Sequence, residues 1–487
     1  MENKTALNWI NSEWVDSDTH NESHNPATGE VIGTYADGTK ADAEKAIAIA
    51  KKTFQETDWK GNRHLRSKVL NEMADRFEEH QDEIIEMLAL ENGKVKDEAG
   101  FEFSLVAPKL RYYAALTLTE SGRALETKPG SYSMVVGEAM GVAGIITPWN
   151  SPVILMIRSL APALAAGCTA VIKMPAQTAQ VNALINKVFA SVESIPKGVI
   201  HQITESGSDV AAELIDSPDV QTISYTGSTK TGTILMKNGA KNLKRFGFEL
   251  GGKTPMIVFD DANLEGTLPV LEKALTTFAG QFCMTGSRIL VQSGIADKLR
   301  EGLAERFKNV KVGPAADESS DMGPMIDKDN VERVDKVVKE AIDAGAKVIV
   351  RGGPITEGEL AKGAFYQPTL LEVTDNKMEI VQEETFGPVA TLQVFDTQEE
   401  AIELANDNMY GLAASVWSTD VDLPLRVVRE IDAGTIWIND WAQVNDEFEE
   451  GGYKMSGLGR LNGMTAIHDF IEYKHIFHKP GTLNDDK

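Results

Sequence analysis

The stretch GVAGIITPWNSPVILMIRSLAPALAAGCTAVIK, residues 141–173, decides the fold class of this chain. It contains a β-branched run over 142–146, a helical pattern over 151–166 and a second strand-like run over 170–173. Two short apolar strands joined by a helix are typical of a βαβ unit, whose strands lie parallel in one sheet. The stretch therefore predicts an α/β fold with a parallel sheet that helices cover on both faces.

The same alternation continues from this stretch to residue 259. Further strands are predicted at 199–203 and 222–225, and further helices at 178–190, 208–215 and 228–238. A sheet of this kind binds ligands outside the carboxyl ends of its strands. Thr226-Gly227-Ser228 stands at such an end, where the N–H groups and dipole of the following helix favour an anion such as a phosphate. The segment GLGR (457–460) lacks a surrounding βα unit and is interpreted as a loop.

A second alternating block follows over 253–444 and predicts a second α/β domain. Its strand-like runs include 346–350, 387–395 and 434–439, whereas amphipathic helices at 41–54 and 63–92 precede the first block. Two strand-like pieces remain, at 132–136 and 470–477. Their alternation suits exposed sheet edges, which proteins usually cover.

Bulk properties exclude several classes of function. At 487 residues the chain is too long for one hydrophobic core, and its 42% apolar and 25% charged residues are ordinary for a soluble globular protein. The net charge of −25 argues against binding nucleic acid or an anionic membrane by bulk attraction. The longest apolar run, 153–166, is interrupted by Arg158 and Pro162 and is too short to span a bilayer.

The cysteines and histidines indicate neither disulfides nor a metal. Cys168 and Cys283 are far apart in the sequence, and residues 1–10 lack the pattern of a signal peptide, so we expect a cytoplasmic protein. The pairs His20/His24 and His475/His478 lie in terminal segments without thiols or carboxylates in a ligand pattern, so we expect no metal site. Cys168 is expected to pack at a helix end.

Cys283 has the setting of a nucleophile. It lies in GQFCMTG (280–286), after a helical pattern over 266–279, where backbone N–H groups can point at a neighbouring oxygen. FELGGKTP (248–255) places Glu249 at a strand end, and TPWNSP (147–152) places Asn150 at a helix start. A nucleophile, a base and an oxyanion donor are then all present. The alternatives are a buried apolar Cys283, a solvated Glu249 and an Asn150 that only caps its helix.

Seven motifs in order make this chain similar to the NAD(P)-dependent aldehyde dehydrogenase superfamily, of the non-acylating, hydrolytic type. They are TPWN (147–150), APALAAG (161–167), TGST (226–229), ELGGK (249–253), GQFC (280–283), EETFGPV (383–389) and GYKMSG (452–457). The resemblance runs from about residue 9 to residue 478. It implies a Rossmann-like NAD(P)-binding domain over 1–117 and 139–250 and a catalytic α/β domain over 251–450. Segments 118–138 and 451–487 would bridge the subunits of a homodimer or homotetramer.

The resemblance also implies a reaction. Cys283 would attack the carbon of a small aldehyde, while the side chain of Asn150 and the backbone N–H of Cys283 hold the oxyanion. After hydride transfer to the nicotinamide, Glu249 would activate the water that hydrolyses the thioester. Acyl transfer to coenzyme A is an alternative that Glu249 argues against. A catalytically silent protein on the same fold is a second alternative, which the intact Cys283, Glu249 and Asn150 argue against.

Cofactor residues follow from the same motifs. By resemblance, Lys173 bonds the adenosine ribose, Glu384 the nicotinamide ribose, and Phe386 packs against the nicotinamide. The remaining expected contacts are Thr147, Trp149, Gly227, Ser228 and Leu250. Ala176 stands where the family often has a glutamate that repels a 2′-phosphate. We therefore expect NAD, with NADP not excluded.

Three departures concern the substrate end. Leu461 replaces a possible relay glutamate, and Glu449-Glu450 replaces the usual Pro-Phe. Arg158, eight residues after Asn150, is expected to line the substrate tunnel and resembles the arginine with which succinic semialdehyde dehydrogenases grip a carboxylate. The match is partial, because Thr277 replaces a second arginine of some of those relatives. A salt bridge from Arg158 to Glu449 or Glu450 is the structural alternative. Carboxylate-bearing semialdehydes and betaine or amino aldehydes both stay open as substrates.

Overall fold

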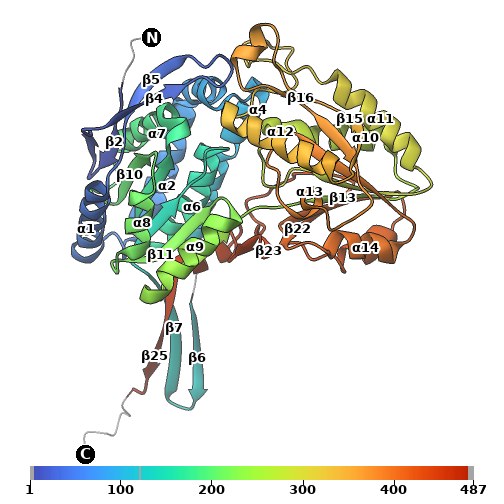
Figure 1. Ribbon diagram of the computed structural model, residues 1–487. Coiled ribbons are helices and arrows are strands. Elements are labelled where there is room, and N and C mark those ends of the chain that lie inside the picture. The colour runs from blue at the N-terminus through green and yellow to red at the C-terminus, as the bar shows by residue number, and fades with distance from the viewer. Residues whose placement is uncertain (1–4, 120–121, 481–487) are drawn as a thin grey trace, which may run out of the picture.

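The computed structural model describes residues 5–119 and 122–480 and contains two α/β lobes and a projecting arm (Figure 1). Residues 1–4, 120–121 and 481–487, parts of the expected segments 1–117, 118–138 and 451–487, lie outside the described residues. The first lobe is built on an eight-stranded sheet and the second on a seven-stranded sheet. This architecture confirms the predicted α/β fold.

The first sheet has the strand order β24-β12-β11-β8-β9-β10-β2-β3. Its strands are β2 (Asn8–Ile10), β3 (Glu13–Val15), β8 (Val142–Ile146), β9 (Thr169–Pro175), β10 (Ile200–Glu205), β11 (Val220–Thr226), β12 (Arg245–Glu249) and β24 (Gly457–Leu458). The strands from β12 to β10 are parallel, and the outer strands β2, β3 and β24 pair antiparallel. The segment 457–460, interpreted as a loop, therefore contributes an edge strand beside the end of β12.

Helices cover both faces of this sheet. They are α1 (Lys40–Glu56), α2 (Arg63–Glu79), α5 (Val106–Thr119), α6 (Pro152–Ala166), α7 (Ala179–Ser191), α8 (Asp209–Asp216) and α9 (Thr229–Gly239). Successive strand residues point to opposite faces. Ile145 and Ile172 pack in the cluster under α2, α5, α6 and α7, whereas Ile146 and Val171 pack in the cluster under α1 and α8. The central strands β8 and β9 therefore bury apolar side chains on both faces of the sheet.

The prediction of one continuous helix over 63–92 is wrong, because the helix is interrupted at His80. His80 has φ −102° and ψ 11°, so α2 ends at Glu79 and α3 (Gln81–Met87) begins anew. A π-helical turn, η1 (Leu88–Asn92), follows and ends at Gly93 with φ 83°. The break lets both α2 and α3 pack against α7. An amphipathic pattern that runs across a short break looks like one helix in the sequence.

The second sheet has the order β15-β18-β19-β14-β13-β21-β22. Its strands are β13 (Pro255–Val258), β14 (Arg288–Gln292), β15 (Lys347–Val350), β18 (Thr369–Glu372), β19 (Val389–Phe395), β21 (Ala413–Trp417) and β22 (Thr435–Ile438). Only β15 pairs antiparallel in this sheet. The main helices around it are α10 (Leu264–Thr276), α11 (Ala296–Asn309), α12 (Lys328–Asp343), α14 (Gln398–Asn406) and α15 (Leu423–Val428). The two lobes thus repeat one architecture with different strand orders.

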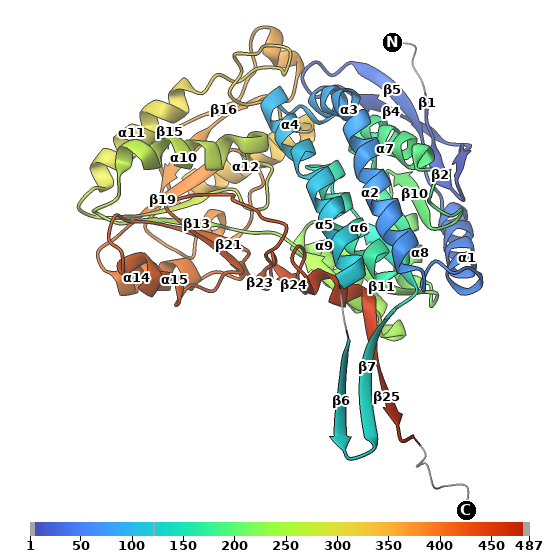
Figure 2. The ribbon, with the colours of Figure 1, turned by 180° about the vertical axis from the view of Figure 1, so that it is seen from behind.

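The arm is a three-stranded antiparallel sheet that extends away from both lobes (Figures 1 and 2). It consists of β6 (Arg123–Lys128), β7 (Ser131–Ala139) and β25 (Ile471–His478), with β7 in the middle. The strand expectations for 132–136 and 470–477 are confirmed. Leu125, Tyr473 and Phe477 on the arm are exposed apolar side chains. Within the described ranges, no helix is long and apolar enough to cross a membrane.

Candidate active site

A cavity of about 320 Å³ lies where the carboxyl ends of the first sheet face the second lobe. We call its two sides the first-lobe wall and the second-lobe wall. The first-lobe wall contains Pro148, Trp149, Asn150, Leu155, Thr226, Gly227, Ser228, Glu249, Leu250 and Gly251. The second-lobe wall contains Cys283, Asn330, Arg333, Glu384 and Phe386. Most of the residues expected to serve catalysis or the cofactor therefore meet in one cavity.

Cys283 is presented by a short left-handed turn. The helix expected over 266–279 ends earlier, because α10 stops at Thr276, and Phe278, Ala279 and Gly280 have φ values of 54°, 54° and 70°. Left-handed backbone costs a non-glycine residue about 1–2 kcal/mol and is often found at functional sites. At Gly280 a Cβ would lie 2.3 Å from the carbonyl carbon of Gly387, so only glycine fits. The turn replaces the last helical turn and directs the chain toward the cavity.

The surroundings of Cys283 favour the protonated thiol over the thiolate. Burial raises its pKa to about 12, and the carboxylates of Glu450, Glu384 and Glu249 act in the same direction. The guanidinium of Arg158 opposes the shift because it favours the thiolate. A nucleophilic thiolate at this position therefore needs a proton acceptor.

Glu249, the last residue of β12, is buried rather than solvated. Burial raises the pKa of its carboxyl to about 8, with Arg158 and Arg460 opposing and Glu450 and Asp469 reinforcing the shift. The alternative of a solvated charge at a strand end is thereby excluded. A carboxyl group with this pKa exchanges protons readily near neutral pH, as general bases must.

Asn150 does not cap α6. Ser151 is the N-cap residue, and the Asn150 Nδ2 donates to the backbone oxygen of Gln281 at 3.0 Å. Gln281 precedes Cys283 by two residues, so the amide of Asn150 is held against the loop that carries the thiol. An amide group has two N–H donors, and this bond occupies one of them.

Other residues of the two walls suit the binding of a dinucleotide. Ser228 is the N-cap of α9, with its side chain accepting from the N–H of Thr231, and so the positive end of the helix dipole lies at the cavity. The rings of Trp149 and Phe386 meet edge to face at 5.6 Å. Glu384 accepts from the N–H of Gly252 at 3.0 Å, and burial raises its pKa to about 7.

Thr147 and Lys173 lie behind the first-lobe wall rather than in it. The hydroxyl and the N–H of Thr147 both donate to the backbone oxygen of Lys173, at 3.1 Å each. Burial lowers the pKa of Lys173, while Glu205 and Asp37 counteract this effect. Their contacts to a cofactor stay a prediction. Cys168 is buried at the end of α6, and burial raises its pKa to about 11.

Arg158 is not part of the cavity wall described above. Arg158 is buried, and its Nη1 forms an ion pair with Glu450 Oε2 at 3.2 Å. This ion pair is one of the two salt bridges that the sequence offered as an alternative to a role in the substrate tunnel. Glu450 Oε2 also accepts from Asn462 Nδ2 at 3.0 Å. The Nε and Nη2 of Arg158 have no hydrogen-bond partner within the part of the chain that the structure describes. Arg158 therefore retains donors that its ion pair does not use.

Six residues of the cavity were not among the predicted site residues, and three of them, Leu155, Asn330 and Arg333, also lie outside the sequence motifs. Arg333 on α12 donates to the backbone oxygens of Thr385 at 2.8 Å and Phe386 at 3.3 Å. The charged positions of an amphipathic helix are usually solvated, so nothing in the sequence of α12 separated Arg333 from its neighbours.

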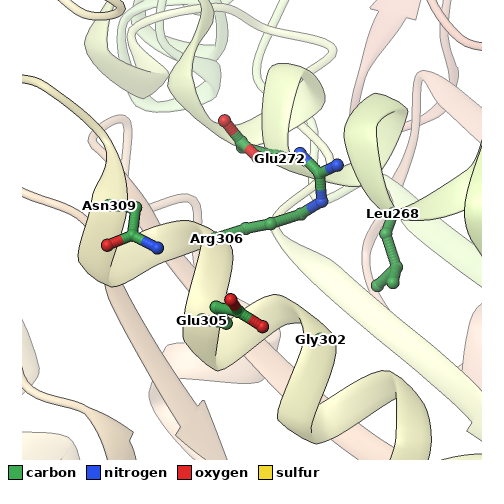
Figure 3. Close-up of a pocket in the computed structure, with 6 residues that line it drawn as sticks. All are labelled: Leu268, Glu272, Gly302, Glu305, Arg306 and Asn309. Carbon is green, nitrogen blue, oxygen red and sulfur yellow. Dashed lines mark hydrogen bonds and ion pairs between the residues drawn. The ribbon is translucent and has the colours of Figure 1, made fainter.

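A second hollow, of about 360 Å³, lies between α10 and α11 (Figure 3). Arg306 extends there toward Glu272, and their Nη1 and Oε2 atoms are 2.6 Å apart. The hollow shares no lining residue with the cavity at Cys283. It is therefore separate from the candidate active site.

Comparison with known proteins identifies the family. Residues 14–476 match the aldehyde dehydrogenase family. The chain is 37% identical to betaine aldehyde dehydrogenase of Bacillus subtilis (strain 168) over 484 residues, 98% of each chain. It is 35% identical to aldehyde dehydrogenase family 2 member C4 of Arabidopsis thaliana over 474 residues, which cover 96% of this chain and 94% of the relative.

A solved structure agrees with these relatives. Betaine aldehyde dehydrogenase from Staphylococcus aureus in complex with NAD⁺ superposes with a TM-score of 0.95 at 36% identity, covering 99% of this chain and 96% of the other. A partly buried thiol, a carboxyl of raised pKa and an amide in one cavity between two α/β lobes are consistent with an oxidoreductase of carbonyl compounds. The chain belongs to the aldehyde dehydrogenase family.

Proposed function

We propose that this aldehyde dehydrogenase oxidises its substrate to a carboxylate through a covalent thioester on Cys283, with NAD⁺ as cofactor. The observation that carries the proposal is the single cavity that brings Cys283, Glu249 and Asn150 together with Glu384 and Phe386. These side chains come from both lobes and from distant parts of the sequence. A structural protein on this fold has no need for such an arrangement, and acyl transfer to coenzyme A has no need for Glu249.

The first half of the reaction forms the carbon–sulfur bond. The thiol of Cys283 loses its proton to water, and the resulting thiolate, which Arg158 favours, attacks the aldehyde carbon. The carbonyl oxygen becomes an oxyanion, which accepts hydrogen bonds from the second N–H of Asn150 and from the backbone N–H of Cys283. The bond from Asn150 to Gln281 fixes the orientation of this amide before the reaction. One such donor lowers the barrier by about 3 kcal/mol.

Bound NAD⁺ supplies the acceptor for the hydride that leaves the adduct. In this chain the N-terminus of α9 at Ser228 suits the pyrophosphate, and Glu384 suits a ribose hydroxyl. Trp149 and Phe386 form an apolar surface for the nicotinamide. Gly251 lets the Glu384 side chain pack closely against the loop after β12, because a Cβ there would lie 2.6 Å from Glu384 Oε2.

The second half hydrolyses the thioester. Glu249 accepts a proton from a water molecule, the hydroxide attacks the acyl carbon, and the carbon–sulfur bond breaks. The carboxylate product leaves, and the thiolate of Cys283 is regenerated. Because burial places the pKa of Glu249 near 8, the ionised base is a fraction of the total at neutral pH.

For the substrate we propose an aldehyde with a distal carboxylate or another hydrogen-bond acceptor. Glu450 Oε2 already accepts from Arg158 and Asn462, whereas Arg158 keeps two buried nitrogen atoms, Nε and Nη2, without a partner among the described residues. A buried unsatisfied donor costs about 1–3 kcal/mol, which an acceptor on the substrate would recover. The names of the B. subtilis and S. aureus relatives favour betaine aldehyde, a cation, which would instead rely on Glu450.

We also propose that the protein is a cytoplasmic homodimer or homotetramer that associates through its arm. The edge strands β6 and β25 expose backbone and apolar side chains such as Leu125 and Phe477, and such edges are normally covered. Sedimentation of the protein before and after deletion of residues 123–138 tests this assembly. A species of unchanged mass would contradict it.

The experiment that tests the reaction is acid quenching of Glu249→Gln after mixing with propanal and NAD⁺, followed by peptide mass spectrometry. The expected result is an acyl group on the peptide that contains Cys283, because hydrolysis fails while acylation proceeds. Acylation of another residue, or none during continued NADH formation, would contradict the proposal.

A further inference from the structure

Helix α4 (Lys96–Ser104) lies at the junction of the two lobes (Figure 2). The chain from the end of η1 to α4 carries four polar side chains that contact both loops of the active site. We call this set the α4 bracket, and it consists of Asn92, Lys94, Glu98 and Glu102. The family motifs described above include none of these residues.

One part of the bracket holds the loop of Asn150. Glu102 is 1% exposed, and its Oε1 accepts from the N–H groups of Val153 at 2.9 Å and Ile154 at 3.3 Å. The N-cap Ser151 makes no side-chain cap bond of its own, so Glu102 satisfies the first turn of α6 from another helix. Asn92 donates to the backbone oxygen of Trp149 at 2.7 Å. The residues on both sides of Asn150 are thus fixed by the bracket.

Another part holds the turn before Cys283. Glu98 Oε1 accepts from the N–H of Phe278 at 2.8 Å. Phe278 is the first residue of the left-handed turn, and its φ of 54° is unfavourable for a residue with a side chain. A hydrogen bond to the N–H of this residue stabilises the turn against the helical continuation that the sequence of α10 would otherwise favour.

Lys94 connects the two parts. Its Nζ forms an ion pair with Glu102 Oε2, donates to Ser151 Oγ at 3.1 Å, and lies 3.9 Å from the centre of the Phe278 ring. It is 2% exposed, and the ion pair and the ring contact stabilise the buried ammonium. One side chain therefore touches the loop of Asn150 and the turn of Cys283 at once.

We propose that Lys94, Glu98 and Glu102 are positioning residues that set the distance between the amide of Asn150 and the backbone of Cys283. The proposal rests on the function proposed above, in which these two groups hold the oxyanion. None of the bracket residues is among those that line the cavity at Cys283. Their effect is transmitted by the backbones of Ser151 and Phe278, which are connected on the cavity side by the bond from Asn150 to Gln281. An error of about 1 Å in such a site can reduce a rate about 100-fold.

The test compares two reactions of the same thiol. Acylation by p-nitrophenyl acetate forms an oxyanion, whereas alkylation by iodoacetamide does not, and neither requires a cofactor. Glu98→Ala is expected to slow acylation about 10- to 100-fold while alkylation of Cys283, followed by peptide mass spectrometry, changes less than about threefold. Glu98→Gln keeps an acceptor for the N–H of Phe278 and should retain acylation within about threefold of the wild type.

Exposed neighbours on the same helix provide matched controls. Asp97→Ala and Lys96→Met alter exposed side chains and should leave both reactions unchanged. Lys94→Met, which keeps the length of the side chain, should reproduce the selective loss of acylation if it folds. If it does not fold, the comparison of Glu98→Ala with Glu98→Gln tests the positioning role alone. Equal loss of acylation and alkylation, or full acylation in Glu98→Ala, would overturn the positioning role. Wild-type turnover in Cys283→Ser would instead overturn the proposed function itself.

Discussion

The two walls of the cavity are constructed in different ways. On the first-lobe wall, Asn150, Ser228 and Glu249 lie at or just after the carboxyl ends of parallel strands, where regular topology brings loops together. On the second-lobe wall, Cys283 follows a left-handed turn, and Phe386 itself has φ 50°. This wall depends on contacts between distant residues, such as Glu98 with Phe278 and Arg333 with Thr385.

The two walls also serve different halves of the proposed reaction. The covalent bond forms on the second-lobe wall, at Cys283, and its hydrolysis is activated from the first-lobe wall, at Glu249. Substitutions on opposite walls should therefore impair different half-reactions, which makes the comparison testable.

The largest effect is expected for Cys283→Ser. An alcohol has a far higher pKa than a thiol, so aldehyde oxidation should fall on the order of 1000-fold or more. NAD⁺ binding, measured by equilibrium dialysis, should stay within about twofold, because the proposed cofactor contacts are made by other residues of the cavity. Retention of more than about a tenth of the wild-type turnover would place the nucleophile elsewhere.

The same contrast explains what the sequence predicted. Strand and helix positions in 141–239 were correct within two residues, because apolar strands alternate there with amphipathic helices. The strand-end location of Glu249 followed from the same pattern. The early end of α10 did not, since the N–H of Phe278 in the left-handed turn donates to Glu98, 180 residues away in the sequence. The pairing of Arg158 with Glu450 and the place of Arg333 likewise depend on contacts between distant segments, for which the chain has no local signal.

A second, smaller effect is expected on the first-lobe wall. Glu249→Gln should reduce steady-state turnover about 100-fold or more, because a neutral amide cannot accept the proton of water. Rapid mixing should still release about one NADH per active site in a burst, since acylation occurs on the other wall. A normal steady-state rate without a burst would rule out Glu249 as the deacylating base.

The pH profile gives a further check on Glu249. Its active form is the ionised one, and burial raises its pKa to about 8, so the deacylation rate should rise with pH and level off above this value. The slow deacylation of Glu249→Gln should lack this rise. A wild-type rate that levels off near pH 4 to 5, the range of an ordinary glutamate, would contradict the effect of burial.

The ion pair behind the cavity should produce an intermediate effect that distinguishes the two substrate classes. Glu450→Gln releases Arg158, so the KM for succinic semialdehyde should fall, whereas a cationic substrate such as betaine aldehyde should bind less well. Arg158→Met should raise the KM for succinic semialdehyde roughly tenfold and leave that for butanal nearly unchanged. The opposite pattern in both variants would favour the cationic substrate.

Removing only Arg158 leaves Glu450 buried without its ion-pair partner, at a cost of about 3–5 kcal/mol in stability. The double variant Arg158→Met with Glu450→Gln removes both charges and should be more stable than Arg158→Met alone, as measured by thermal unfolding. It should still show the raised KM for succinic semialdehyde. Equal changes for the charged and the neutral substrate in the double variant would leave Arg158 as a structural residue.

The smallest effect is expected at Ala176, which belongs to neither wall of the cavity. Ala176 is half-buried at the start of η2 (Ala176–Thr178), directly after β9, so a carboxylate introduced there would be partly screened by solvent. Ala176→Glu should weaken NADP⁺ relative to NAD⁺ by about 1 kcal/mol, roughly fivefold in the ratio of kcat/KM values, because the new charge repels the 2′-phosphate. Ala176→Gln, with the same shape and no charge, is the matched control and should leave the ratio near that of the wild type. The shift should shrink at high ionic strength. An unchanged ratio in Ala176→Glu, or an equal shift in Ala176→Gln, would mean that charge at this position does not select the cofactor.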